Sequence, residues 1–206
     1  MDSETTARHW DEAYRHGDST RSWFQHRPLA SLTILDAIGA SPRDSVIDVG
    51  GGASPLVDAL LERGHNDVTV LDISHAALSA AQRRLGAANG SVDWLVTDVL
   101  SWRPSRRWDI WHDRAVLHFF TANADLARYL RALDMATSRT GFAILATFAP
   151  DGPQSCSGLA VARYDSQQLA RLLGDQWRFV TGRREEHHTP GGGIQPFTWA
   201  AFRRRR

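Results

Sequence analysis

The sequence predicts an α/β fold in which helices cover both faces of a mostly parallel sheet. Strand and helix signals alternate along most of the 206 residues, which is the pattern of parallel strands joined by crossover helices. The first buried strand breaks into a glycine-rich turn, as strands do at the ligand-binding edge of such sheets. The length suits a single domain with a sizeable core, and we find no internal repeat and no interdomain linker.

The elements follow from local signals taken in chain order. Trp10 and Tyr14 stand four apart and predict a helix over 5–16. A second helix over 27–38 ends at Gly39 and Pro42. Helices are then expected at 55–63, 75–85, 124–136 and 165–173, the last capped by Asp165, and parallel strands at 45–49, 68–71, 92–96, 108–112 and 141–148. Segments 177–186 and 196–203, joined by a Gly-rich connection, predict an antiparallel hairpin.

The glycine turn indicates which ligand the sheet edge accepts. Ser54 can cap the next helix with Pro55 at its first position, and Asp72 ends the second strand where a carboxylate can hold ribose hydroxyls. A pyrophosphate cofactor favours G-x-G-x-x-G, but the third glycine would fall on Pro55. Asp48, still on the strand, instead suits a phosphate-free ligand with a positive end, such as S-adenosylmethionine.

The run Asp48-x-Gly-x-Gly-x-Ser resembles motif I of the class I S-adenosylmethionine-dependent methyltransferases. The resemblance covers roughly residues 40–205 and implies a Rossmann-like sheet of seven strands, the last antiparallel and inserted beside the fifth. Within the family, the chain looks like bacterial small-molecule methyltransferases of the thiopurine and trans-aconitate groups. The stretch 22–25 also resembles the eukaryotic elongation-factor lysine methyltransferases.

The cofactor is expected along the ends of the first strands. Asp48 would favour the ammonium, Asp72 would accept from both ribose hydroxyls, and glycines would let the backbone approach the methionine portion. The resemblance adds that Asp98 receives the adenine amino group. The alternatives are an Asp48 that bonds its own turn and an Asp72 that caps the following helix. The full expected cofactor set is Asp48, Gly50, Gly51, Gly52, Asp72, Ile73, Asp98, Val99, Asp113, Arg114 and Trp23.

The acceptor is expected beside the end of the strand at 108–112. We predict His118 and Asp113 as catalytic residues, although a base is needed only if the acceptor arrives protonated. The alternative is a His118 that is simply buried in a helix turn. The expected acceptor-contacting set is Trp10, Tyr14, Phe24, His118, Cys156 and His188. The aromatic members, with Trp23, form either a lid over the sulfonium or plain helix packing.

Composition narrows the function further. The net charge of +1 gives no electrostatic footprint for nucleic acid, no apolar run predicts a membrane span, and the polar N-terminus lacks a signal-peptide pattern. A single cysteine fits a reducing cytosol, so we expect a cytoplasmic protein. Adjacent His187 and His188 point to opposite faces of a strand, so no metal is expected.

We therefore predict a helical lid over residues 1–40 and a methyltransferase core over 41–206. The expected activity is methyl transfer from S-adenosylmethionine to a small-molecule acceptor, with S-adenosylhomocysteine as product, by a monomer or homodimer. The alternatives are a protein or peptide methyltransferase, a non-catalytic cofactor-binding protein, and an oxidoreductase, which Pro55 disfavours.

Overall fold

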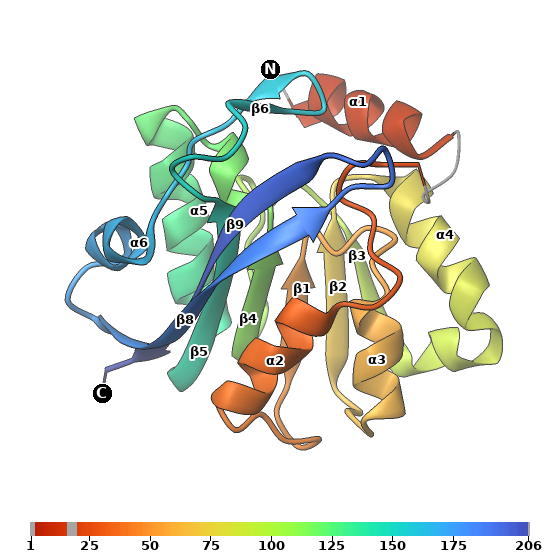
Figure 1. Cartoon of the computed structure of the whole chain (residues 1–206). Coiled ribbons are helices and arrows are strands. Elements are labelled where there is room, and N and C mark those ends of the chain that lie inside the picture. Colours follow the sequence, from red (N-terminus) through yellow and green to blue (C-terminus); the bar gives the residue numbers. More distant parts are fainter. Residues whose placement is uncertain (1–2, 16–19, 206) are drawn as a thin grey trace.

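A central seven-stranded sheet organises the chain (Figure 1). This computed structural model describes residues 3–15 and 20–205. The strands run in the order β3-β2-β1-β4-β5-β9-β8. The sheet strands are β1 (Val46–Val49), β2 (Val68–Asp72), β3 (Val92–Val96), β4 (Trp108–Arg114), β5 (Thr137–Phe148), β8 (Trp177–His188) and β9 (Ile194–Arg204). Because β9 pairs antiparallel with both β5 and β8, the predicted insertion of the last strand is confirmed.

Helices cover both faces of the sheet, as predicted. The helices are α1 (Ser3–Arg15), α2 (Leu29–Ala37), α3 (Leu56–Glu62), α4 (His75–Leu85), α5 (Asn123–Ala136) and α6 (Ser166–Leu173), with short 3₁₀ turns η1 (Gly86–Ser91) and η2 (Leu117–Phe119). Neighbouring strand residues alternate between two hydrophobic clusters, one shared with α2, α3 and α4, the other with α5 and α6. Among the described helices, none is long and apolar enough to cross a membrane.

Several boundaries differ from those predicted. Helix α2 begins after Pro28 rather than at residue 27, and Pro55, not Ser54, is the N-cap of α3, although the Ser54 hydroxyl accepts from Leu56 N at 3.1 Å. Between β5 and α6, where no strand is predicted, the chain forms a small hairpin, β6 (Ser155–Cys156) with β7 (Leu159–Ala160). The predicted helix end at His16 lies outside the described residues.

The N-terminal helices pack in different ways. Leu32, Ile34 and Leu35 of α2 belong to the same cluster as the strand residues, so α2 is part of the main core. Helix α1 has no buried residue and lies across the carboxyl ends of the parallel strands, next to α4 (Figure 1). The lid role predicted for residues 1–40 stays a prediction, with α1 as the part placed to serve it.

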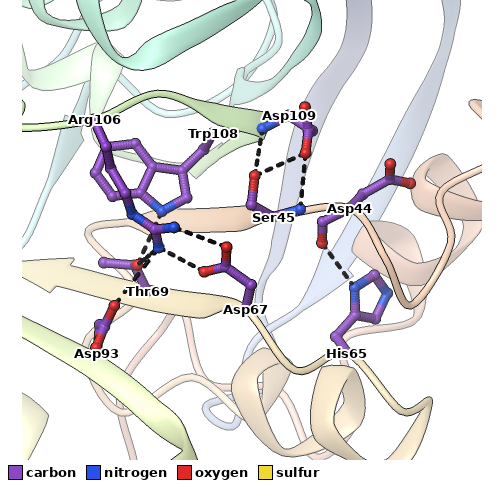
Figure 2. A network of polar contacts seen from close by, with 9 residues as sticks. All are labelled: Asp44, Ser45, His65, Asp67, Thr69, Asp93, Arg106, Trp108 and Asp109. Carbon is purple, nitrogen blue, oxygen red and sulfur yellow. Dashed lines mark hydrogen bonds and ion pairs between the residues drawn. The ribbon is translucent and has the colours of Figure 1, made fainter.

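Polar contacts fix the opposite edge of the sheet, where the parallel strands begin (Figure 2). Ser45 N and Oγ donate to Asp109 Oδ2 at 3.1 and 2.8 Å, joining the segment before β1 to β4. Arg106 donates through both terminal nitrogens to Asp67 and through Nη2 to Thr69 Oγ1. These contacts hold the starts of β1, β2 and β4 together, and none of these residues lines the ligand cavity described below.

Candidate active site

A cavity of about 400 Å³ lies at the carboxyl ends of the parallel strands. Its lining comes from α1, from residues 23–25, from the loops after β1, β2, β3 and β4, and from the β6–β7 hairpin. Figure 1 shows α1 and β6 above this edge of the sheet. Ligands of open α/β sheets bind at this edge, so the cavity is the candidate site.

The glycine turn forms one wall of the cavity. Gly50 and Gly52 have φ of +66° and +51°, in the left-handed region that favours glycine. A Cβ on Gly51 would lie 2.6 Å from Asp48 Oδ2, and one on Gly52 would lie 2.6 Å from the Tyr14 hydroxyl. Gly50 and Gly51 line the cavity, whereas Gly52 is buried behind the lining. The turn therefore keeps the backbone close to Asp48 and leaves room beside it for a ligand.

Asp48 is held in place by a buried relay. His112 Nδ1 lies 2.7 Å from Asp48 Oδ1, and His112 Nε2 lies 3.0 Å from Ser31 Oγ. The carboxylate is only 3% exposed yet belongs to the cavity lining. The alternative in which Asp48 only bonds its own turn is therefore wrong, since its carboxylate bonds His112 of β4 and also lines the cavity. The role of His112 escaped sequence reasoning, because its partner comes from a different strand.

Asp72 ends β2 with its carboxylate turned to the cavity. Burial raises its pKa to about 7, and the negative charge of Asp48 adds to the rise, while backbone N–H groups of Ser74, Gly52 and Ile73 oppose it. The N-cap of α4 is Ser74, whose hydroxyl accepts from Ala77 N at 3.1 Å. Asp72 is not the N-cap itself, but its Oδ1 accepts from the backbone N–H of Ser74 at 2.7 Å and so also holds the start of α4. Its contact with ribose hydroxyls stays a prediction.

The loop after β3 completes this half of the site. Asp98 and Val99 both line the cavity, as does Ile73 after β2. Asp98 Oδ1 accepts from Leu100 N at 2.9 Å, which shapes the loop. Carboxylates from β1, β2 and the loop after β3 therefore follow one another along adjacent strands. Such a row suits a ligand rich in hydrogen-bond donors, or one with a positive charge.

Asp113 is a structural residue rather than a site residue. It is fully buried and absent from the cavity lining, because its side chain points to the α5 face of the sheet. Its carboxylate accepts from Val116 N at 2.8 Å, Leu117 N at 3.0 Å and the Tyr129 hydroxyl at 2.5 Å. Burial raises its pKa to about 6 against these hydrogen bonds. The structure thus corrects the predicted catalytic and cofactor-binding roles of Asp113.

Arg114, the next residue on β4, points to the opposite face and lines the cavity. Its Nη1 donates to the carbonyl oxygen of Trp23 at 3.0 Å. This bond ties the end of β4 to the segment that follows α1. Arg114 therefore lies at the cavity, and its predicted contact with the cofactor stays a prediction.

Four aromatic residues predicted to cover the site converge on the cavity: Trp10, Tyr14, Trp23 and Phe24. Trp10 packs edge-to-face on Trp23 with ring centroids 5.8 Å apart. Trp23 Nε1 donates to the Tyr14 hydroxyl at 3.2 Å. Trp10, Tyr14 and Trp23 thus form a connected aromatic roof with Phe24 also in the lining, and their movement and ligand contacts stay predictions.

Asp11 anchors α1, and sequence reasoning missed it. Its Oδ1 accepts from Ser74 Oγ at 2.7 Å and from Ala76 N at 3.0 Å. These bonds join the roof helix to the start of α4, two residues after Asp72. A lone aspartate on an amphipathic helix carries no signal for such a distant partner.

His118 does not reach the cavity. Its ring is fully buried in η2, packed on Phe119 and Phe148 with centroids 4.5 and 4.8 Å away. Burial lowers its pKa to about 3, and the charge of Arg114 adds to the shift. The prediction that His118 contacts the acceptor is therefore wrong, and the buried alternative is right.

The remaining acceptor-side predictions divide. Cys156 lines the cavity, but burial raises its pKa to about 11, so the thiol stays protonated at neutral pH. His188 is exposed and lies outside the cavity lining, so its predicted contact with the acceptor has no support. The neighbouring His187 faces the protein interior instead, with its Nε2 2.7 Å from Ser22 O. Over residues 3–15 and 20–205, no group of three or more His, Cys, Asp or Glu side chains is placed to hold a metal.

Comparison with known proteins agrees with the geometry. Residues 46–141 match the family model described as a methyltransferase domain. Residues 46–141 are therefore identified as a methyltransferase domain. S-adenosylmethionine is the cofactor of this family, and the three carboxylates fit its hydroxyl, amino and ammonium donors. A comparison with curated proteins found no match.

Solved structures share the methyltransferase fold at low sequence identity. A methyltransferase from Anabaena variabilis is 15% identical over 98% of this chain and 95% of its own, with a TM-score of 0.77. The 1,6-didemethyltoxoflavin N1-methyltransferase from Burkholderia thailandensis is 20% identical over 99% and 87%, with a TM-score of 0.73. A protein that converts a disulfide into a thioacetal in echinomycin biosynthesis is 22% identical over 97% and 93%, also at 0.73.

Proposed function

We propose that this methyltransferase acts on a small-molecule acceptor held inside the roofed cavity. The observation that carries the proposal is that one cavity is lined both by the three carboxylates and by Arg114 and Cys156. Its volume of about 400 Å³ lies in the range of small-molecule sites, roughly 300–1,000 Å³. When bound, S-adenosylmethionine would supply a methyl group on a sulfonium: the acceptor's nucleophile would bond to the methyl carbon in line as the carbon–sulfur bond breaks and S-adenosylhomocysteine leaves.

The cofactor half of the cavity works by matching donors to acceptors. Asp72 would take the ribose hydroxyls, because it ends β2 and lies in the cavity lining. Asp98 would take the adenine amino group, and Asp48, held by His112, would face the ammonium. These contacts orient the ligand along the sheet edge.

The other contribution of the chain is to exclude water and align the acceptor. The roof of Trp10, Tyr14, Trp23 and Phe24 covers the cavity with aromatic faces, which attract positive charge and keep out water. The Cys156 thiol is held protonated, so it is no base at neutral pH. Because the sulfonium is already an activated leaving group, the chain would raise the rate mainly by aligning the acceptor with the methyl group.

The Burkholderia structure supports a small acceptor, because that protein was crystallised with 1,6-didemethyltoxoflavin and S-adenosylhomocysteine. The same fold could serve a protein substrate if the roof opened into a groove. The hydrogen bonds of Asp11 hold α1 against the start of α4, so that α1 covers the cavity. A covered cavity favours a small acceptor over a protein substrate. Placement in the thiopurine or trans-aconitate groups remains a prediction.

Methyl-labelled S-adenosylmethionine tests the proposal. We would incubate the protein with a host cell extract and separate the labelled products into a low-molecular-weight fraction and a protein fraction. The proposal expects label in the small-molecule fraction. Label confined to the protein fraction would instead establish a protein methyltransferase.

A further inference from the structure

Arg114 lines the cavity and has a buried hydrogen-bonding edge without a partner among the described residues. Its Nη1 is used by the Trp23 carbonyl, and its guanidinium carbon lies 4.9 Å from the centroid of the Phe197 ring. Its Nε and Nη2 are buried and have no hydrogen-bond partner within the described part of the chain. Nε–H and one Nη2–H share one edge of the guanidinium plane and point the same way. This edge matches the two oxygens of a carboxylate.

The acids around this edge are already engaged. Glu185 Oε1 accepts from Gln25 Nε2 at 3.1 Å, and its Oε2 accepts from Trp199 Nε1 at 2.6 Å. Asp48 Oδ1 is taken by His112 at 2.7 Å. Across residues 3–15 and 20–205, no ion pair to Arg114 is found within 4.0 Å. A buried cation without an anion is costly, and a ligand that brings an anion removes that cost.

The edge lies beyond the row of cofactor carboxylates. Asp48, Asp72 and Asp98 belong to β1, β2 and the loop after β3. Arg114 belongs to β4 and stacks on Phe197 of β9, on the other side of β1 in the strand order. The Cys156 thiol lines the same cavity and feels the Arg114 charge. Arg114 therefore stands at the end left for the acceptor.

We propose that the Nε–Nη2 edge of Arg114 receives a carboxylate of the acceptor, so that the substrate class is an organic acid. The inference rests on the proposed function, since it names the acceptor of the same cavity. The aromatic roof and Phe119, which also lines the cavity, favour an acid with an apolar or aromatic body. His118 and His187 bring no competing charge, because burial and the nearby guanidinium lower the pKa of both.

The test uses the protein saturated with S-adenosylhomocysteine. Benzoate is titrated calorimetrically against its neutral counterpart benzamide, followed by a panel of aromatic and aliphatic carboxylic acids, each beside its amide. We expect the acids that fit to bind about tenfold or more tightly than their amides, the gain of a charge-assisted two-point contact. Arg114→Met should abolish this preference, and Arg114→Lys, which keeps the charge without the fork, should reduce it.

Two controls separate this inference from the proposed function. Arg183→Gln, on an exposed position of β8, should leave both acid and cofactor binding unchanged. Arg114→Met should keep the affinity for S-adenosylhomocysteine within about threefold. Its melting temperature should hardly change, since the lost hydrogen bond to the Trp23 carbonyl is offset by removal of a buried charge that has no ion-pair partner within the described residues. No difference between acids and amides across the panel overturns the inference. So does a large loss of cofactor affinity in Arg114→Met, which would assign the edge to the cofactor carboxylate.

If the wild-type protein failed to bind S-adenosylhomocysteine, the proposed function itself would fail.

Discussion

Cofactor affinity should depend on pH through Asp72. In the free protein, burial raises the pKa of this carboxyl to about 7, well above its ordinary value of 3.8. Ribose hydroxyls that donate to the carboxylate favour its charged form, so the pKa falls when the cofactor binds. Binding below pH 7 must then release a proton, and affinity rises with pH until Asp72 is ionised in the free protein.

The expected size follows from that pKa. At pH 6 about one Asp72 in ten is ionised, whereas at pH 8 about nine in ten are, so the Kd for S-adenosylhomocysteine should fall about tenfold between the two. Asp72→Asn removes the titrating group, so its Kd should be independent of pH over this range. At pH 8 the variant should bind more weakly by about 1–3 kcal/mol, the usual cost of losing a charged hydrogen-bond acceptor.

Isothermal titration in buffers of different ionisation enthalpy measures both the Kd and the released proton. Asp72→Glu is a useful companion, because it keeps the charge while moving the carboxylate. If the wild-type protein and Asp72→Asn showed parallel pH profiles, the titration would belong to another group, and the ribose assignment would lose its support.

Three further outcomes are expected. Asp113→Asn should lower the free energy of unfolding in urea by about 3 kcal/mol, since Asp113 accepts three buried hydrogen bonds. The affinity for S-adenosylhomocysteine should stay unchanged. A loss of affinity with intact stability would show that Asp113 belongs to the site. His118→Phe should keep turnover. It should raise the free energy of unfolding by about 1 kcal/mol, because both buried ring nitrogens lack hydrogen-bond partners within the described chain. A hundredfold fall in turnover would instead indicate a catalytic role for His118. Asp11→Ala should free α1 from Ser74, so that limited proteolysis cuts α1 faster while the melting temperature of the core hardly changes; unchanged cleavage would mean that α1 is held by other contacts.

The cofactor half of the site could be predicted because its signals are local. Asp48 and Asp72 lie on recognisable buried strands and Asp98 follows the next strand, and parallel strands bring their carboxyl ends to one edge. The glycine turn and the capped helices are equally local, and Asp165 forms the expected cap with Gln168.

The acceptor half depended on packing that the sequence does not encode locally. Alternation along β4 says that Asp113 and Arg114 face opposite ways, but only the packing of α5 decides which of them faces the cavity. The same rule separates His187 from His188. His118 lies in a 3₁₀ turn whose inward side is set by Phe148 from β5, far along the chain.

The most direct test of the account is calorimetric titration of the wild-type protein with S-adenosylhomocysteine and, separately, with NAD. The account predicts one-to-one binding of S-adenosylhomocysteine, weakened by Asp48→Asn and by Asp72→Asn, and no heat with NAD. Binding of NAD without binding of S-adenosylhomocysteine would contradict it.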